Sequence, residues 1–168
     1  MNLNPESPLQ KLMDTLPQQG KVCWIGIRPA RGEDLVSLQQ VEALQNKGLK
    51  DDHYSKKLLP GKRQVTLIQQ EHLHAVASIM QTDLLSPNLF RRNIVVSGIN
   101  LLSLKGKTFR VGTALLEYTG ECHPCSRMEQ NLGAGGYNAM RGHGGITARI
   151  VEGGMIQVND LVLSSLQK

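Results

Sequence analysis

Residues 148–158 read ARIVEGGMIQV. Two short apolar runs, at 148–152 and 155–158, flank the pair Gly153-Gly154. Short β-branched runs are typical of strands, and a two-residue glycine connection between them predicts a β-hairpin. This stretch therefore predicts a fold built from short strands.

The same pattern recurs along the chain. Further short runs, apolar or β-branched and each punctuated by Gly, Pro or Asn, lie at 22–27, 64–68, 93–96, 109–111 and 114–118. Many short strands with regular turn signals are typical of a β-barrel or a β-sandwich. We therefore expect a mainly β protein.

Helical spacing is confined to a few segments. Apolar residues recur with helical periodicity over 68–80, more weakly over 8–16, and again over 126–132, where Gly133 predicts the end of the helix. Residues 133–145, GAGGYNAMRGHGG, contain six glycines. Such a segment is too rich in glycine for a packed strand or helix, so we expect a loop whose backbone closely approaches something else.

Length and composition limit the class of protein. A chain of 168 residues is the size of one domain. Three cysteines are too few for a disulfide-built secreted module, which favours a reducing cytoplasm. The first residues lack the cationic start and apolar run of a secretory signal, and no stretch approaches the roughly 20 apolar residues of a membrane span. We expect a cytoplasmic protein that does not associate with membranes.

The charge favours an anionic ligand of low molecular weight. The net charge is +5 and the pI is near 9.3, but the basic residues lie in small groups along the chain. Aromatic residues make up only 4% of the sequence, which leaves few surfaces on which bases could stack. We therefore expect no stable nucleic-acid complex.

Residues 117–130, EYTGECHPCSRMEQ, place two cysteines around His-Pro. A strand, CxPC and a helix in this order are typical of a thioredoxin-like dithiol site, although only 43 residues follow Cys125, too few for the rest of that fold. Cys122, His123, Cys125 and His143 could offer zinc ligands, but a second well-spaced pair is missing. Ser126 excludes haem attachment through CxxCH.

The two cysteines of this motif have different surroundings. Cys125 lies at the predicted start of a helix and close to Arg127, and both features stabilise a thiolate. Cys122 could be a small buried residue. Cys23, within an apolar strand, is expected in the core.

Residues 121–162, from ECHPC to NDLV, resemble the C-terminal half of a stand-alone MOSC domain, the domain named for the C-terminal part of molybdenum-cofactor sulfurases. Residues 48–53, GLKDDH, are similar to the family pattern GLxGDxH. Residues 63–68, RQVTLI, are similar to RxVTLI, and residues 91–96, RRNIVV, to an R-x-N-hydrophobic segment. The order and spacing of these motifs make the resemblance specific.

The resemblance implies a strongly bent β-barrel of short strands, like the barrel of pyruvate kinase, with two or three short helices. The domain would span residues 22–163, and residues 1–21 would form an N-terminal extension packed on the barrel. Asp51 stands where the family pattern has glycine, and Asn159 replaces a second glycine. Asn tolerates a left-handed conformation, so Asp51 is the departure that bears on the turn before His53.

The resemblance also implies that the protein binds a molybdenum cofactor of the molybdopterin type, with a thiolate as ligand to the metal. Cys125 matches the position of that thiolate, and molybdenum accepts soft sulfur ligands. Arg91 and Asn93 match a segment that contacts the cofactor in amidoxime-reducing relatives. Arg63 and His53 are expected to face the same cleft.

Other side chains would complete this site. Arg127 and Arg141 would stabilise the thiolate and hold the pterin phosphate, which the N–H groups of Gly135 and Gly136 would line.

The histidines divide into two kinds. His143, flanked by glycines, is a candidate proton donor. His72 and His74, on an amphipathic helix, are expected to be packing or surface residues.

Three functions remain open on the sequence. The first is reduction of small N-hydroxylated substrates, such as hydroxylaminopurines or amidoximes. Three cysteines cannot build a four-cysteine iron–sulfur centre and we expect no pyridoxal-phosphate domain, so the electrons would come from a redox partner protein. The second is a carrier that holds a persulfide on Cys125 or holds the cofactor for delivery. The third is a CxPC thiol–disulfide oxidoreductase.

Overall fold

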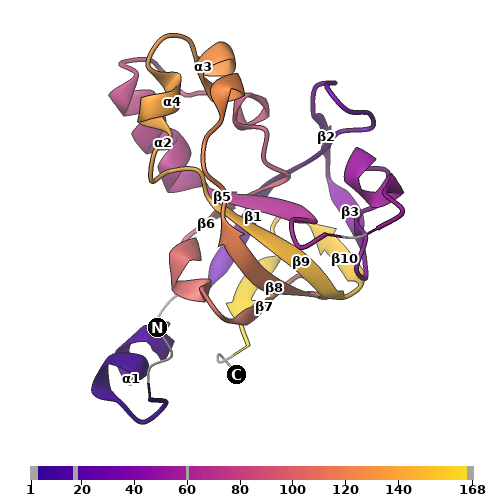
Figure 1. Ribbon diagram of the computed structural model, residues 1–168, viewed down its shortest axis with the longest axis vertical. Helices are drawn as coiled ribbons and strands as arrows, with labels where there is room; N and C mark the ends of the chain where they lie inside the picture. Colours follow the sequence, from indigo (N-terminus) through magenta and orange to yellow (C-terminus); the bar gives the residue numbers. More distant parts are fainter. Residues whose placement is uncertain (1–3, 17–18, 60, 166–168) are drawn as a thin grey trace.

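A closed barrel forms the centre of the computed structural model, which describes residues 4–16, 19–59 and 61–165 (Figure 1). Among these residues, seven strands follow one another around the ring in the order β11-β7-β8-β9-β5-β6-β1, and β1 pairs with β11 to close it. All neighbours are antiparallel except β5 and β6. The strands are β1 (Gly20–Ile27), β5 (Val65–Gln69), β6 (Ile94–Ser97), β7 (Thr108–Val111), β8 (Ala114–Glu121), β9 (Ile146–Glu152) and β11 (Leu161–Ser164). An extra strand, β2 (Val36–Leu38), pairs with β1. The mainly β, barrel-like prediction is confirmed.

A second, smaller sheet shows that the predicted hairpin at Gly153-Gly154 is wrong. It has the order β10-β3-β4 and consists of β3 (Gln40–Leu44), β4 (Gly48–Leu49) and β10 (Gly154–Gln157). Strand β9 belongs to the barrel, whereas β10 pairs with β3, with Ile156 opposite Val41. The chain therefore passes from one sheet to the other at the two glycines.

Steric crowding, not turn geometry, explains these glycines. A Cβ atom on Gly153 would lie 2.9 Å from the carbonyl oxygen of Ala43, and one on Gly154 would lie 2.6 Å from Oγ1 of Thr113. Neither glycine has a positive φ, which a type I′ hairpin turn would require. The pair lets three segments approach closely where the sheets meet.

Each predicted helix is present. Helix α1 (Pro8–Asp14) begins at Ser7, whose Oγ accepts a hydrogen bond from the backbone N–H of Gln10. Helix α2 (Gln70–Ile79) provides the crossover that the parallel pair β5–β6 requires. Helix α3 (Ser126–Leu132) ends at Gly133, as predicted.

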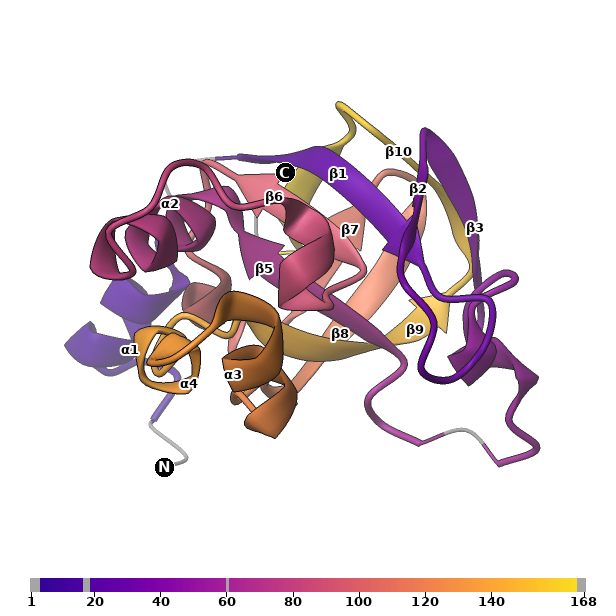
Figure 2. The ribbon, with the colours of Figure 1, turned by 90° about the horizontal axis from the view of Figure 1, so that it is seen from above.

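Shorter helical turns accompany these. The one-turn helix α4 (Gly136–Ala139) interrupts the predicted glycine loop. Three 3-10 turns are η1 (His53–Lys56), η2 (Pro87–Phe90) and η3 (Leu101–Leu104). Helices α2, α3 and α4 gather at one end of the barrel (Figures 1 and 2).

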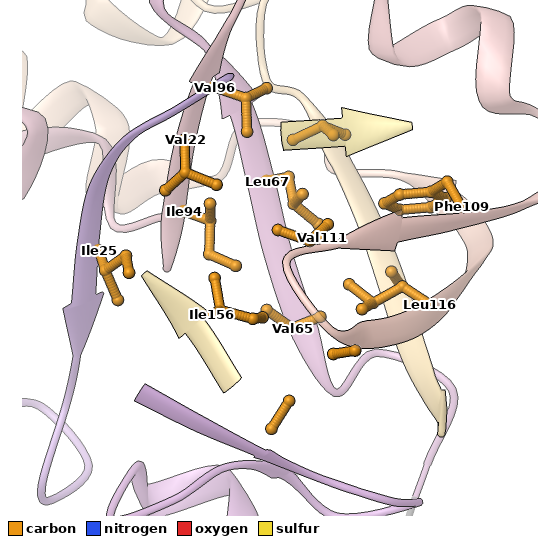
Figure 3. Packing of buried hydrophobic residues seen from close by; sticks show 14 of the residues in the cluster. Val22, Ile25, Val65, Leu67, Ile94, Val96, Phe109, Val111, Leu116 and Ile156 are labelled. Carbon is orange, nitrogen blue, oxygen red and sulfur yellow. The ribbon is translucent and has the colours of Figure 1, made fainter. Parts of the chain in front are cut away.

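Two groups of buried apolar side chains hold these layers together. The larger group fills the barrel with residues from nearly every strand, among them Ile25, Leu67, Ile94, Phe109 and Leu116 (Figure 3). The smaller lies under the helices at the barrel end and includes Val76, Phe90 and Met128. Burial of each such side chain stabilises the fold by about 1.5–3 kcal/mol. Cys23 is half-buried beside this second group, and its Sγ lies 3.1 Å from Oγ of Ser97.

The predicted N-terminal extension includes Leu16, which is partly buried and packs against the larger group of apolar side chains. Helix α1 has no buried side chain, and Asp14 forms an ion pair with Lys107 with an Oδ1–Nζ distance of 3.1 Å. Residues 1–3 and 17–18 of this extension lie outside the described residues, and β1 begins at Gly20. Within the described part of the chain, no helix has the length and apolar character needed to cross a membrane.

Candidate functional site

A cleft opens beside the helical end of the barrel, where β1, η1, β5 and η2 end or begin. Its cavity volume is about 110 Å³, far above the roughly 15 Å³ that one water requires on the same measure. The cleft is lined by Arg28, Asp52, His53, Tyr54, Arg63, Gln64, Thr66, Arg91 and Asn93. Four of the residues that the sequence predicted, His53, Arg63, Arg91 and Asn93, therefore come together in one place.

Arg91 reaches the cleft through an unusual backbone conformation. It follows the last residue of η2 and has φ 56° and ψ 35°, in the left-handed region that non-glycine residues seldom adopt. Burial lowers the pKa of its guanidinium, and the positive charge of Arg127 lowers it further. Arg91 thus faces other cations in a partly desolvated place.

Asn93 supports the walls of the cleft. Its Oδ1 accepts hydrogen bonds from the backbone N–H of Thr66 at 3.1 Å and from the Thr66 hydroxyl at 2.9 Å. Its Nδ2 donates to the carbonyl oxygen of Gly26 at 3.1 Å. The amide therefore ties β1 and β5 to β6 and positions the site.

Asp52, which sequence reasoning passed over, holds the opposite wall. This buried carboxylate accepts hydrogen bonds from the backbone N–H of Arg28 and of Tyr54, each at 2.9 Å, and from Nδ2 of Asn93 at 3.3 Å. Asp51 adopts φ 64° and so takes the left-handed conformation expected of the glycine it replaces. The turn before His53 is thus intact, and the Asp of the GLxGDxH-like motif was the signal that could have identified Asp52.

Arg28 is the second residue that sequence reasoning missed as a site residue. The end of β1 at Arg28-Pro29 was visible, but nothing indicated that the side chain turns into the cleft. Its Nε is buried and has no hydrogen-bond partner among the described residues. Burial lowers the pKa of Arg28, and the nearby charge of Arg91 adds to that effect. Arg28 is therefore a desolvated cation with a free donor.

Cys125 lies near this group of cations. It is exposed and precedes the first residue of α3. The negative charge of a Cys125 thiolate would oppose the lowering of the pKa of both Arg91 and Arg92. Arg127, on the first turn of α3, is exposed and acts on Arg28 and Arg91.

Cys122 differs from Cys125 in exposure and in its contacts. It is buried, with 5% of its surface exposed. Its backbone N–H donates to the carbonyl oxygen of Gly145 at 2.8 Å, and its Sγ lies 3.7 Å from Nη2 of Arg63 as a hydrogen-bond acceptor. Cys122 therefore anchors its segment and orients a cleft arginine.

The glycine-rich segment makes its close approaches to the protein itself. A Cβ atom on Gly144 would collide with the carbonyl oxygen of Cys122, and one on Gly145 with that of Leu67. The N–H of Gly135 donates to Oε1 of Glu129 at 2.8 Å, and that of Gly136 to the carbonyl oxygen of Gly133 at 3.0 Å. The two N–H groups predicted to line a phosphate are thus already engaged, because α4 forms there and Glu129 caps it.

His143 and Arg141 lie outside the cleft. The ring of His143 packs edge-on against His72 of α2, with 5.0 Å between ring centroids, and its Nδ1 is buried without a hydrogen-bond partner among the described residues. His72 is a packing residue, as predicted, and His74 on the same helix is exposed. Arg141 is exposed, and no hydrogen bond or ion pair of the described chain connects it with the cleft. The histidine that lines the cleft is His53.

The described residues contain no group of three or more His, Cys, Asp or Glu side chains placed to hold a metal ion. The zinc interpretation of Cys122, His123, Cys125 and His143 therefore has no structural support. The cleft instead has an excess of positive charge. Five arginines, Arg28, Arg63, Arg91, Arg92 and Arg127, act on one another electrostatically, against the carboxylates of Asp34 and Asp52. Such an excess suits an anionic ligand.

Comparison with known proteins agrees with this architecture. The family model described as the MOSC domain matches residues 46–163. No curated protein matches the chain.

The crystal structure of the YuaD protein from Bacillus subtilis is similar, with a TM-score of 0.76 and 18% sequence identity over 88% of this chain and 97% of that one. Two crystal structures of YiiM are also similar. That from Escherichia coli has a TM-score of 0.65 and 16% identity over 86% of this chain and 69% of that one. That from Geobacillus stearothermophilus has a TM-score of 0.63 and 15% identity over 86% and 74%. Identities this low show a shared fold, and the family match extends over most of the barrel. The chain belongs to the MOSC domain family.

Proposed function

We propose that the arginine cleft beside Cys125 binds a pterin-based molybdenum cofactor, and that the protein reduces N-hydroxylated compounds such as hydroxylaminopurines or amidoximes. One observation carries this proposal. Arg28, Arg63 and Arg91 line one cleft, and an exposed cysteine lies within electrostatic range of its cations. The site combines arginine side chains, which bind phosphate, with a cysteine, whose thiolate is a soft ligand for a metal.

The residues present fit such a cofactor. The buried Nε of Arg28 has no hydrogen-bond partner within the described part of the chain, and the arginines outnumber the nearby carboxylates, so an anion would satisfy a donor and reduce repulsion at once. Arg28, Arg63 and Arg91 would hold the phosphate through charge-assisted hydrogen bonds. Cys125 would be the protein's ligand to the metal. When bound, the cofactor supplies two-electron reduction.

The proposed reaction breaks the N–O bond of the substrate. Two electrons and two protons enter, and the products are the corresponding N–H compound and water. We assign the supply of electrons to a redox partner protein, because three cysteines cannot build a four-cysteine iron–sulfur centre. His53 lines the cleft, with its Nδ1 3.2 Å from Oδ1 of Asp52, although the two atoms lack hydrogen-bond geometry. We assign His53, in place of His143, the delivery of protons.

A second candidate function is a carrier of sulfur or of the cofactor. The exposure of Cys125 favours it, because a persulfide on that residue would be accessible to a partner enzyme. The thioredoxin-like alternative has lost its main support, since the chain forms a barrel of a different fold.

Cofactor content tests the proposal. The wild-type protein and the variants Cys125→Ser, Cys122→Ser and Cys23→Ser are purified from a host that makes the cofactor. Molybdenum is measured by mass spectrometry, and pterin by the fluorescence of its oxidised form. We expect molybdenum and pterin together in the wild type and in Cys23→Ser, and loss of molybdenum in Cys125→Ser. A wild-type protein without molybdenum or pterin would contradict the proposal.

Turnover separates the enzyme from the carrier. The loaded protein is given a chemically reduced dye as electron donor and an N-hydroxylated base as substrate, and the N–H product is quantified. The reductase is expected to form product in the wild type and none in Cys125→Ser. Bound cofactor without turnover, or a persulfide on Cys125 detected by its mass, would instead support the carrier.

A further inference from the structure

Arg92 is a buried arginine that links three separate segments. Only 6% of its surface is exposed. Its Nε donates to the carbonyl oxygen of Gly144 at 2.7 Å, its Nη1 to that of Phe90 at 2.9 Å, and its Nη2 to that of Cys122 at 3.2 Å. One side chain thus joins the end of η2, the CxPC segment and the glycine-rich turn.

The charge of Arg92 has no carboxylate partner. None of the hydrogen bonds and ion pairs among the described residues joins its guanidinium to an acid. Burial lowers the pKa of Arg92; thiolate charge at Cys122 or Cys125 would oppose that effect, and the positive charges of Arg63 and Arg91 add to it. A buried cation that contacts only carbonyl dipoles is unfavourable for stability alone. It also adds positive potential to its surroundings.

The three bonds connect the segment that carries Arg91 with the segment that carries Cys125. Phe90 immediately precedes Arg91, and Cys122 is three residues before Cys125. Cys122 is held in addition by Gly145 through its N–H and by Arg63 through its sulfur. The guanidinium of Arg92 therefore fixes the Arg91 segment relative to the segment that carries Cys125.

We propose that Arg92 is a positioning residue of the anion-binding cleft. Its fork of hydrogen bonds sets the relative placement of Arg91 and the CxPC segment, and its unpaired charge increases the affinity of the cleft for an anion that it does not touch. The inference rests on the proposed function only in taking the cleft as an anion site. It makes no use of molybdenum chemistry.

Binding of inorganic phosphate to the cofactor-free protein tests this role. Dissociation constants are measured by calorimetry at constant ionic strength for the wild type, Arg92→Lys and Arg92→Met. Arg149→Met is the control, since Arg149 lies outside the cleft, is exposed and bonds to Glu117. We expect Arg92→Met to raise the dissociation constant about tenfold, because the substitution removes a desolvated positive charge near the cleft and the hydrogen bonds that position Arg91. Arg92→Lys, which keeps the charge but loses the fork, should raise it by less, and Arg149→Met should leave it unchanged.

Thermal unfolding without phosphate separates this role from a merely structural one. A structural role would lower the melting temperature of the Arg92 variants and leave their phosphate dissociation constants at the wild-type value, which would overturn the inference. A wild-type protein that does not bind phosphate would overturn it as well. If Arg92→Met does not fold, Arg92→Lys decides, and an unchanged dissociation constant in that variant would refute the proposal. Phosphate binding without molybdenum in the isolated protein would refute the proposed function and leave this inference standing.

Discussion

At the scale of one residue, Arg28 offers the cleft a buried hydrogen-bond donor that an anion could satisfy. The donor, Nε of Arg28, is buried and has no hydrogen-bond partner among the residues that the structure describes, and Arg28 shares the cleft with two further arginines. We predict that Arg28→Met weakens phosphate binding about 10- to 100-fold, because a hydrogen bond to a charged group contributes about 1.5–3 kcal/mol. Arg28→Lys, which retains the charge, should lose less. Calorimetric titration with phosphate measures both.

Arg31 provides the control for this substitution. It is exposed, lies three residues further along the chain and does not line the cleft. Arg31→Met should therefore bind phosphate like the wild type. An equal loss in the Arg28 and Arg31 variants would mean that only the net charge of the protein matters, against our assignment of Arg28 to the site.

Two single residues show that a turn can persist where the family motif loses its glycine. Asp51 and Asn159 depart from the family pattern at two glycine positions, yet they adopt φ values of 64° and 79° and so preserve the turns. Asn and Asp both adopt this conformation more readily than other non-glycine residues, and the following residue, Asp52, is held by hydrogen bonds from the N–H groups of Arg28 and Tyr54.

At the scale of elements, the turn at 142–145 holds the CxPC segment in place. Gly142 and Gly145 have nearly equal φ values, 78° and 80°, but a Cβ atom on Gly142 would meet open space and one on Gly145 would collide with the carbonyl oxygen of Leu67. We predict that Gly142→Ala destabilises the protein by about 1–2 kcal/mol, the strain of a left-handed Ala. Gly145→Ala should cost at least about 3 kcal/mol, since overpacking adds to that strain.

Urea-induced unfolding compares the two alanine variants directly. The two glycines share nearly the same φ and the same turn, so the difference reports chiefly on the close approach to β5. Equal destabilisation of the two variants would contradict the packing described here.

The elements divide into those that local patterns determine and those that they do not. Helices α2 and α3 and six of the seven barrel strands were predictable, because apolar spacing, and Gly133 at the end of α3, are local signals. Strand β11, which closes the barrel against β1, was not predicted. Strands β3 and β4 and the change of sheet at Gly153-Gly154 were not, because they depend on which distant strand supplies a partner. The one-turn helix α4 was hidden by its glycines and forms where the Glu129 carboxylate accepts from the N–H groups of Gly135 and Tyr137.

At the scale of the whole molecule, the packing of α2 on the glycine-rich turn predicts sensitivity to acid. Burial lowers the pKa of His72, the neighbouring His143 lowers it further, and Glu71 opposes both effects. The folded state thus holds fewer protons on His72 than the unfolded state. Its contribution to stability is complete above the ordinary histidine pKa of about 6.5 and is lost as the pH falls below that value.

We therefore predict that His72→Gln reduces the loss of stability between pH 7.5 and pH 5. One proton sets an upper limit of about 1.4 kcal/mol per pH unit, and the partial exposure of the ring keeps the effect below that limit. His74→Gln, on the exposed side of the same helix, is the control and should follow the wild type. Thermal unfolding across this pH range measures the difference, and identical profiles for the wild type and His72→Gln would exclude the assigned role.

The site as a whole could be predicted in part. The family motifs predicted that His53, Arg63, Arg91 and Asn93 face one cleft, and all four residues line it. Arg28 and Arg92 could not be predicted as members of the site, since only the folded chain shows, over its described residues, a donor of Arg28 without a partner and a buried Arg92 that bonds only to carbonyl oxygens.

The most direct test of the central claim is X-ray absorption at the molybdenum edge, on the wild type and on Cys125→Ser isolated from a cofactor-producing host. If Cys125 is the protein's ligand to the metal, molybdenum in the wild type will have one more sulfur ligand than any molybdenum that remains in Cys125→Ser. Molybdenum in Cys122→Ser will have the same number of sulfur ligands as in the wild type. Equal numbers of sulfur ligands in the wild type and Cys125→Ser, or a wild-type protein without molybdenum, would contradict the account.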